Sequence, residues 1–325
     1  MTKATKKSKS TAAPPPSRLR DFVVWRRRPS EPTATVTAPA RDVLRRPAPP
    51  ASAASPPAAC DGAKAKGQFF TRPKLAKRYL RVLEKHVDLA TLQIVEPSAG
   101  QGAFLQILPE GTFGCDIESM CADVFTADFL TLDISSNRHL AFVGNPPFGR
   151  NAKLAIRFFN HAARQCDVIA FILPRTFRKA GTINQLNDAF HLLHEELVPP
   201  KAFIFEGRPH SVTTVFQIWV RREERREQLP DVKTHPDFEF TTWDDGDFAI
   251  QRVGKYAGRV HHDMDRSRRA HYFIKGDVEG VMRKCQSAFA RAARNTAGYP
   301  SLSMGEIVSI YGKRASRDRS KRRNA

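Results

Sequence analysis

The chain has 325 residues, 41% of them hydrophobic, so it is long enough for one or two domains with a sizeable core. Its 53 Lys and Arg residues against 33 Asp and Glu residues give a net charge of +20, which favours a polyanionic partner, either nucleic acid or an acidic membrane surface. No uncharged apolar run reaches the roughly 18 residues of a membrane-spanning helix, and residues 1–20 lack the apolar core of a secretory signal. We therefore expect an intracellular protein without a membrane segment.

The N-terminal residues 1–66 differ in composition from the rest of the chain. They hold 11 prolines, and 14 Lys and Arg residues against four acidic ones. Such a segment buries too little apolar surface to offset its ordering entropy, so we expect a disordered basic arm that attracts nucleic acid non-specifically. A transit peptide, or a nuclear signal around Lys6, Lys7 and Lys9, is the alternative interpretation.

Strand-like and helix-like segments alternate over residues 67–225. A helix is predicted after residue 72, with Thr71 as its cap and Pro73 in its first turn. The strand candidates are residues 92–95, 113–115, 140–143, 168–173, 202–205 and 213–220. Amphipathic helices are predicted at 152–163 and 183–193. This alternation predicts an α/β domain with a parallel doubly wound sheet, and the short connection 206–212 predicts that its last two strands form an antiparallel hairpin.

A smaller α+β appendage is expected over residues 226–311. Residues 221–237 read as a charged helix end and linker, and strands are predicted at 248–253 and 271–275, followed by a helix capped by Asp277. Between residues 251 and 275 seven cations stand against two acids, a pattern that suits a phosphate-binding surface or an exposed charged face. Residues 312–325 are expected to form a second disordered basic tail.

Two motifs in the predicted α/β domain suit a cofactor loop. In VEPSAGQGAF, residues 95–104, Gly100 and Gly102 would let a ligand lie against the backbone, and a helix N-terminus behind them would favour an anion. Asp116 ends the next predicted strand, about twenty residues after Glu96. An acid at that position accepts hydrogen bonds from ribose hydroxyls in dinucleotide-type folds.

The strongest motif is Asn145-Pro146-Pro147-Phe148, which follows an apolar strand and precedes a helix. Two successive prolines make the backbone rigid and withhold N–H donors. The oxygens of Asn145 and Pro146 would accept both protons of an exocyclic amino group, and Phe148 would stack on its ring. These hydrogen bonds raise the electron density on the nitrogen and prepare it for attack on an electrophilic methyl group.

Together these motifs resemble the S-adenosylmethionine-dependent methyltransferases that modify the N6 amino group of adenine in nucleic acids. The resemblance covers residues 67–221, about half of the chain. It implies a Rossmann-like, mostly parallel seven-stranded sheet and direct in-line methyl transfer, with Asn145, Pro146, Pro147 and Phe148 as the catalytic set. The cofactor S-adenosylmethionine would be held by Phe70, Thr71, Glu96, Gly100, Gly102, Asp116, Asp128 and Phe129. Asp128 would take the adenine amino group of the cofactor and Phe129 would lie beside its ring.

The resemblance leaves the substrate open. DNA is slightly favoured over RNA, since residues 67–70 and 96–104 look most like DNA adenine enzymes. Only eleven residues separate Asp116 from Asp128, too few for the helix that usually stands there. An inactive nucleic-acid-binding protein with a methyltransferase-like core and a protein glutamine-N5 methyltransferase are the alternatives.

Other candidate sites are weaker. His210-Ser211 lacks the glycines of a hydrolase nucleophile elbow. Adjacent His261 and His262, with Asp263 and Asp265, are typical of a solvated polar run, so we expect no metal. The five cysteines include no Cys-x-x-Cys pair, which indicates neither a disulfide framework nor a zinc site and fits a reducing compartment.

Overall fold

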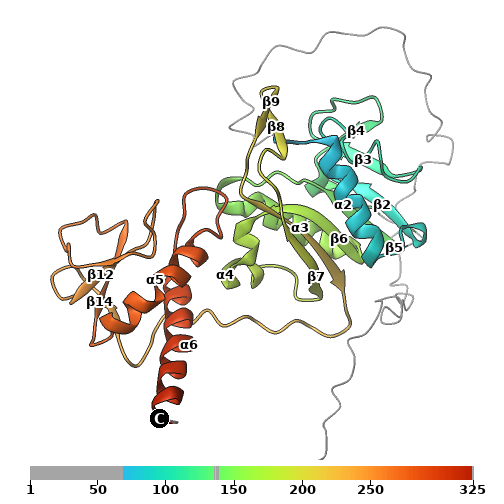
Figure 1. Ribbon diagram of the computed structural model, residues 1–325. Helices are drawn as coiled ribbons and strands as arrows, with labels where there is room; N and C mark the ends of the chain where they lie inside the picture. Colours follow the sequence, from blue (N-terminus) through green and yellow to red (C-terminus); the bar gives the residue numbers. More distant parts are fainter. Residues whose placement is uncertain (1–68, 135, 137–138, 324–325) are drawn as a thin grey trace, which may run out of the picture.

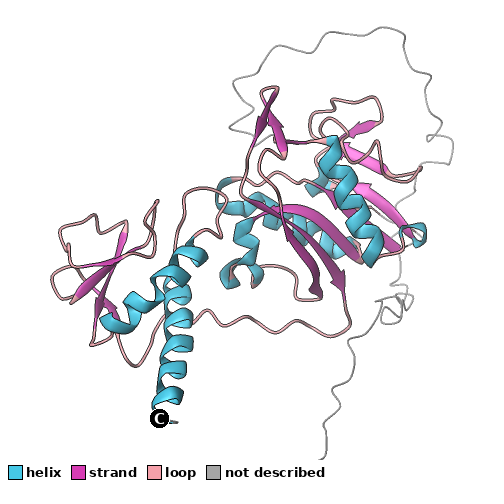
Figure 2. Cartoon of the chain, in the orientation of Figure 1, coloured by secondary structure: helices cyan, strands magenta, loops and turns pink. Residues whose placement is uncertain are grey.

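The computed structural model describes residues 69–323 apart from 135, 137 and 138. The expected arm, residues 1–66, lies outside the described part of the chain. The described residues form a larger unit up to about residue 221 and a smaller one from residue 239, joined by an extended segment (Figure 1, Figure 2). Hydrophobic clusters form a separate core in each unit.

Seven strands form the central sheet of the larger unit: β2 (Leu92–Glu96), β3 (Phe113–Asp116), β4 (Val124–Thr126), β5 (His139–Gly144), β6 (Val168–Pro174), β7 (Phe190–Leu197) and β10 (Thr214–Arg221). Their order across the sheet is β4-β3-β2-β5-β6-β10-β7. The first five are parallel, and β10 is antiparallel to both of its neighbours. This order confirms the expected Rossmann-like, mostly parallel seven-stranded sheet with one antiparallel strand.

Helices cover both faces of this sheet. They are α2 (Pro73–His86), α3 (Lys153–Gln165) and the short α4 (Ala180–Ile183), with 3-10 turns η3 (Leu89–Thr91), η4 (Phe129–Thr131), η5 (Arg150–Ala152) and η6 (Arg175–Arg178). The ring of Tyr79 on α2 stacks on Phe216 of β10, with centroids 4.2 Å apart. On the other face, Phe159 of α3 meets Trp219 of β10 edge to face at 5.4 Å. Residues 216 and 219 point to opposite faces, so β10 is buried from both sides.

A second, three-stranded sheet stands beside the central one. It consists of β1 (Phe70–Thr71), β8 (Phe203–Phe205) and β9 (Arg208–His210), in the order β1-β8-β9. Glu206 and Gly207, both with positive φ, make the tight turn between β8 and β9. Because β1 pairs with β8, residues 69–71 are tied to a segment more than 130 positions further along the chain. Thr71, expected as a helix cap, is therefore a strand residue, and Arg72 is the N-cap of α2.

The predicted hairpin pairs different strands from those expected. Residues 202–205 lie in the small sheet, and the neighbour of β10 at the sheet edge is β7. Residues 184–193 do not continue as a helix beyond α4. Two asparagine side chains bond the backbone here instead: Asn187 accepts from the N–H of Ala189 at 3.0 Å, and Asn160 accepts from the N–H of Asn187 at 2.8 Å. Such bonds compete with the helical ones and end the helix.

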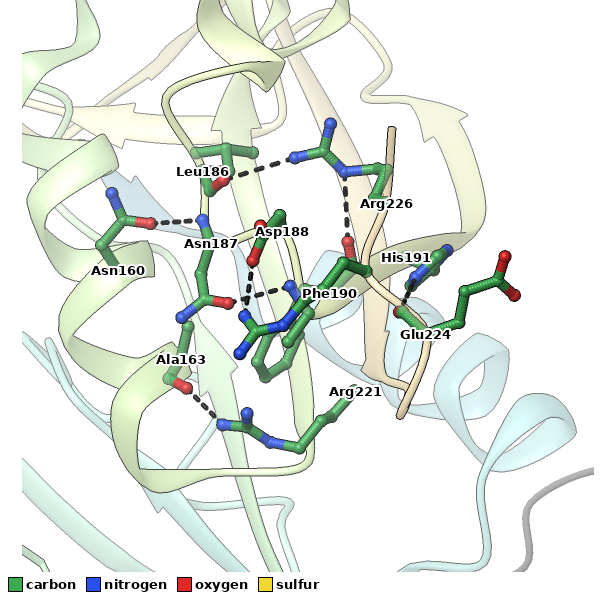
Figure 3. A network of polar contacts seen from close by, with 12 residues as sticks. Asn160, Ala163, Leu186, Asn187, Asp188, Phe190, His191, Arg221, Glu224 and Arg226 are labelled. Atoms are coloured by element: carbon green, nitrogen blue, oxygen red, sulfur yellow. Dashed lines mark hydrogen bonds and ion pairs between the residues drawn. The ribbon is translucent and has the colours of Figure 1, made fainter. Parts of the chain in front are cut away.

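An extended segment, rather than the expected helix end, leaves the sheet after Arg221. Figure 3 shows the polar network that holds it against the larger unit. The Arg226 guanidinium donates to the carbonyls of Ile183 and Leu186 at 2.9 and 3.3 Å, and Arg225 pairs with Asp188 at 2.5 Å. These bonds satisfy carbonyls at and just beyond the end of α4, where helical partners are missing.

The smaller unit is an α+β structure. It contains strands β11 (Glu239–Thr241), β12 (Phe248–Gln251), β13 (Val260–His261) and β14 (His271–Lys275) and helices α5 (Glu279–Ala293) and α6 (Met304–Arg323). The antiparallel strand order is β11-β14-β12-β13. The N-cap of α5 is Val278 rather than Asp277.

The expectation of a disordered C-terminal tail is wrong for residues 312–323, which continue helix α6. The helix begins inside the core of the smaller unit, where Tyr311 and Ala315 are buried. The Tyr311 hydroxyl donates to Asp237 at 3.0 Å, and Arg314 pairs with Asp318 one turn later. Tertiary packing and helical ion pairs thus order a segment whose composition alone indicates disorder.

The two units touch beside the end of β6. Lys179 donates to the carbonyl of Ser301 at 2.8 Å and pairs with Glu306 at 3.0 Å, and Arg178 donates to the Asn295 side chain at 3.1 Å. The loop between α5 and α6 is therefore held against the larger unit. Within the described ranges, we find no helix with the length and apolar character needed to cross a bilayer.

Candidate functional site

A cavity of about 520 Å³ opens at the carboxyl ends of β2, β3 and β5. This volume is typical of small-molecule sites. All but one of the twelve predicted site residues line the cavity: Phe70, Thr71, Glu96, Gly100, Asp116, Asp128, Phe129, Asn145, Pro146, Pro147 and Phe148. Gly102 is the exception and lies buried behind the wall. The tertiary structure therefore gathers segments from five parts of the chain around one hollow.

The glycine loop follows β2 and is built from turns. Residues 100–107 form no regular helix, so the expected helix N-terminus behind the loop is absent there. Gly100 and Gly102 have φ of +50° and +75°, a region that favours glycine. A Cβ at Gly100 would lie 3.1 Å from the Phe70 ring, and one at Gly102 would lie 3.2 Å from the Cys121 sulfur. Glycine at these two positions thus allows the positive φ angles and also leaves space for the neighbouring Phe70 and Cys121 side chains.

Asp116 holds this loop against the end of β3. One carboxylate oxygen accepts the N–H of Gly100 at 2.8 Å, and the other accepts the N–H of Glu118 at 3.1 Å. Each carboxylate oxygen has a second lone pair, so Asp116 can still accept from a ligand in the cavity. The residue predicted to bind a ribose is therefore also the one that shapes the loop.

Asp128 and Phe129 follow β4 on the far side of the cavity. Between Asp116 and Asp128 the chain forms only the strand β4 and turns, as the short spacing indicated. Asp128 accepts the N–H of Leu130 at 2.9 Å and so caps the turn η4. Phe129 is buried against Phe142 and Phe158, with centroids 5.2 Å away in each case.

The diproline corner faces this same cavity. The Asn145 amide nitrogen donates to the carbonyl of Phe69 at 2.8 Å, which turns its oxygen to the other side. That oxygen is buried and has no hydrogen-bond partner. Phe148 is only 8% exposed and packs in the cluster that contains Phe158, so a small part of its ring surface is available to a ligand.

Three unpartnered polar atoms lie around the cavity. They are the Thr71 hydroxyl, one Glu96 carboxylate oxygen and the Asn145 amide oxygen. Burial raises the pKa of Glu96 well above its ordinary value, because the carboxyl is shielded from water. Buried polar groups normally have partners, so three of them at one hollow indicate a polar ligand. S-adenosylmethionine carries an ammonium group and hydroxyls that fit the Thr71 and Glu96 atoms, which leaves the Asn145 oxygen for a second ligand.

The structure adds residues that are not among the twelve predicted site residues. The Phe69 carbonyl orients Asn145, and Phe69 itself stacks on His210 of β9, with centroids 5.4 Å apart and an angle of 11° between the rings. Arg157 on α3 is an exposed cation on the cavity wall. The α3 pattern indicates a helix with a polar face, but nothing in the sequence separates Arg157 from the other cations of that face.

The weaker candidates have ordinary partners. His262 pairs with Glu279 at 2.9 Å, and Asp263 pairs with Arg266 at 2.6 Å. Among the described residues, no three His, Cys, Asp or Glu side chains lie close enough to hold a metal ion. His210 packs on aromatic rings.

No family model matches the chain, and no curated protein matches it in sequence. Solved structures that are similar to it in fold include the following three. One is assigned as the modification subunit of a type I restriction enzyme from Vibrio vulnificus, with 16% identity, a TM-score of 0.37, and coverage of 50% of this chain and 46% of that one. Another is assigned as a class I S-adenosylmethionine-dependent methyltransferase from Listeria monocytogenes, with 12% identity, a TM-score of 0.38, and coverage of 49% and 64%.

The third is assigned as an RNA methyltransferase from Pyrococcus horikoshii, with 17% identity, a TM-score of 0.36, and coverage of 48% of this chain and 87% of that one. The chain thus spans 46% and 64% of the first two structures. The similarity concerns about half of this chain in each case.

Proposed function

We propose that the chain is an S-adenosylmethionine-dependent methyltransferase that modifies the N6 amino group of adenine in nucleic acid. One observation carries this proposal. The Asn145 amide oxygen is buried, has no partner, and lines the same cavity as Glu96, Gly100 and Asp116. An acceptor of this kind beside a cofactor-sized hollow suits an amino group that must be held and polarised.

The residues of the cavity divide into two groups. Phe70, Thr71, Glu96, Gly100, Asp116, Asp128 and Phe129 would hold S-adenosylmethionine, which supplies an electrophilic methyl group when bound. Glu96 would accept from its ammonium group and Asp116 from its ribose hydroxyls. Gly102 would act indirectly, by allowing the turn on which Gly100 sits.

Asn145 and Pro146 would hold the target amino group. Their two oxygens would accept its two protons, and the hydrogen bond from Asn145 to Phe69 keeps the acceptor side of the amide towards the cavity. Because Pro146 and Pro147 restrict the backbone, the acceptors need little reorganisation when the base arrives. Phe148 would contribute the accessible part of its ring to stacking.

A base must leave a duplex stack to reach Asn145 inside the cavity. An unpaired adenine would therefore enter at lower cost than a paired one. The net charge of +20 supports a nucleic-acid substrate over a protein glutamine, although the glutamine amide offers the same two protons. DNA remains the slightly favoured substrate over RNA, because the motifs look most like those of DNA adenine enzymes.

The decisive experiment incubates the protein with labelled S-adenosylmethionine and parallel pools of DNA, RNA and protein, followed by nucleoside and amino-acid analysis. We expect N6-methyladenine in a nucleic-acid pool and its loss, by about 10²- to 10³-fold or more, in Asn145→Ala. Cofactor affinity should stay near the wild-type value in that variant. Full transfer by Asn145→Ala would contradict the catalytic assignment, label on glutamine would identify the alternative substrate, and failure to bind cofactor would identify an inactive binding protein.

A further inference from the structure

Cation–aromatic pairs gather at one end of the four-stranded sheet in the smaller unit. In this sheet Gln251 lies opposite His271 and Thr241 lies opposite Phe273, so β11 and β12 finish at the end where β14 begins. Three cation–aromatic pairs lie in and beside the segments at this end, with the cation 4.7–5.4 Å from the ring centroid. They are Arg252 over Tyr272, Lys255 over Tyr256, and Arg268 over Trp243.

The aromatic rings at this end are unusually exposed. Tyr256 is 55% exposed and Trp243 is 37% exposed. Tyr299, at 84%, joins them because Gly254 donates to the Pro300 carbonyl at 2.9 Å and residue 253 bridges residue 301. We call Trp243, Tyr256 and Tyr299, with Lys255 and Arg268, the aromatic end.

The segment that follows β12 is rich in cations, although Asp244 and Asp245 follow Trp243 directly. Seven cations stand against two acids between residues 251 and 275. Arg266 and Lys275 are neutralised by ion pairs with Asp263 and Asp245. Lys255 and Arg268 instead lie over aromatic rings, where a phosphate can reach their charge, although Asp244 also lies near Arg268.

The loop that carries Tyr299 contacts the larger unit at the edge of the central sheet where the cavity opens. The loop that carries Tyr299 is held by Arg178 and Lys179, which follow the carboxyl end of β6. Strand β6 is parallel to β5, with residue 171 opposite residue 144, so both strands finish at one edge. Asn145 begins the diproline corner at that edge.

We propose that the aromatic end binds an unpaired nucleic-acid strand next to the target base, stacking its bases on Tyr256 and Tyr299 and its phosphates against Lys255 and Arg268. Exposed rings interleaved with cations are the means by which proteins hold single strands without sequence preference. The inference rests on the proposed function for the chemistry of its ligand. It adds the form of that ligand and the surface that binds it.

Binding of single strands by the full-length protein tests this, measured by fluorescence anisotropy with unpaired DNA and RNA oligonucleotides of about 20 nucleotides, longer than the sites of about 4–16 nucleotides in known single-strand modules. Tyr256→Ala and Tyr299→Ala should each raise the Kd roughly tenfold, because each removes a stacking surface. Tyr256→Phe should retain wild-type affinity, since the ring remains. Phe125→Ala is the matched control, because Phe125 is 58% exposed on β4, at the opposite edge of the central sheet.

The salt dependence separates stacking from charge. Lys255→Gln should reduce the slope of log Kd against log salt by about 0.7, the value for one phosphate contact with a single strand. Tyr256→Ala should leave that slope unchanged. Lys77→Gln, on the exposed face of α2, provides the matched charge control.

The outcomes distinguish this inference from the proposed function, because binding is measured without methyl transfer. Wild-type affinity in both Tyr→Ala variants would overturn it even if adenine is methylated. Equal affinity for a matched duplex, or no binding of any oligonucleotide, would also overturn it, and the latter would point to a protein partner. Weakened binding in the Tyr→Ala variants would support it whether or not a methylated product is found.

Discussion

The Asn145 amide donates to the Phe69 carbonyl at 2.8 Å, across 76 positions of the chain. This bond decides which side of the amide faces the cavity, because the donor is used by the protein and the acceptor is left for a ligand. The partner carbonyl is positioned in turn by the pairing of β1 with β8. The orientation of the expected catalytic acceptor therefore depends on a small sheet outside the central one.

Asn145→Asp tests this orientation. The substitution replaces the amide donor with an oxygen that faces the Phe69 carbonyl. Because two buried acceptors then face each other without a proton between them, the free energy of unfolding should fall by about 1–3 kcal/mol. Turnover should fall, and residual activity should be highest at low pH, where a protonated carboxyl can still donate to Phe69. Thermal unfolding and pH-dependent methyl transfer measure both effects.

Asn160→Asp is the matched control for that variant. The Asn160 amide also donates to a carbonyl, that of Gln185 at 2.8 Å, but Asn160 lies outside the cavity wall. It should lose stability and keep its turnover. Wild-type turnover in Asn145→Asp at every pH would show that the orientation of the amide is unimportant.

Gly100→Ala should weaken cofactor binding. Its φ of +50° disfavours any Cβ, and that Cβ would lie 3.1 Å from the Phe70 ring on the cavity wall. We expect a loss of about 1–2 kcal/mol in unfolding free energy from the backbone alone, and a raised Kd for S-adenosylmethionine as the ring shifts. Calorimetric titration and urea unfolding give the two quantities.

Gly111→Ala separates the two contributions. Gly111 also has a positive φ, of +84°, but a Cβ there would meet no atom within 4 Å. Its stability should fall by a similar amount while its cofactor affinity stays unchanged. Equal cofactor affinity in Gly100→Ala and the wild type would remove Gly100 from the proposed site.

Glu96 should make stability depend on pH. Folding raises the pKa of this carboxyl, mainly through burial. The stability that the protonated form contributes is fully present below the unfolded pKa of about 4.3 and is lost as the pH rises through the folded value. The free energy of unfolding should therefore fall with rising pH in that window, by up to about 1.4 kcal/mol per pH unit.

Urea unfolding over a pH series, with and without Glu96→Gln, measures this contribution. The amide keeps the shape of the side chain and cannot ionise, so the variant should show a flatter dependence than the wild type. Parallel curves for the two proteins would mean that Glu96 titrates normally. The affinity of the wild type for S-adenosylmethionine should rise with pH, because the ionised Glu96 carboxylate is a partner for the ammonium group of the cofactor.

Asp128→Ala tests the adenine-side assignment. Asp128 caps a 3-10 turn by accepting the N–H of Leu130 at 2.9 Å, and Asp88 caps η3 in the same way with Ala90 at 3.1 Å. Both substitutions should cost about 1 kcal/mol of stability as lost caps. Only Asp128→Ala should raise the Kd for cofactor, because Asp88 lies outside the cavity wall. Equal cofactor affinities in the two variants would exclude Asp128 from binding.

The local sequence pattern predicted strands correctly where burial is uniform along the strand. β2, β5 and β6 are nearly continuous apolar runs, as expected of parallel strands covered on both faces, and they lie within one residue of their predicted bounds. Pattern failed for β7, where the spacing of apolar residues 183, 186, 190 and 193 fits a helix but asparagine side chains end the helix after α4. It also failed for residues 312–323, whose helix depends on contacts with the core of the smaller unit.

The sequence by itself determined the chemistry of the candidate site, because the diproline motif, the glycine turn and the acids at strand ends are each read from neighbouring residues. Only the tertiary structure decided that these segments surround one cavity, that Phe69 orients Asn145, and that Gly102 stays behind the wall. The physical reason is the distance along the chain between the residues that interact. Rigidity of Pro-Pro and the φ of glycine are local properties, whereas the pairing of β1 with β8 and the burial of Glu96 depend on residues far apart in the chain.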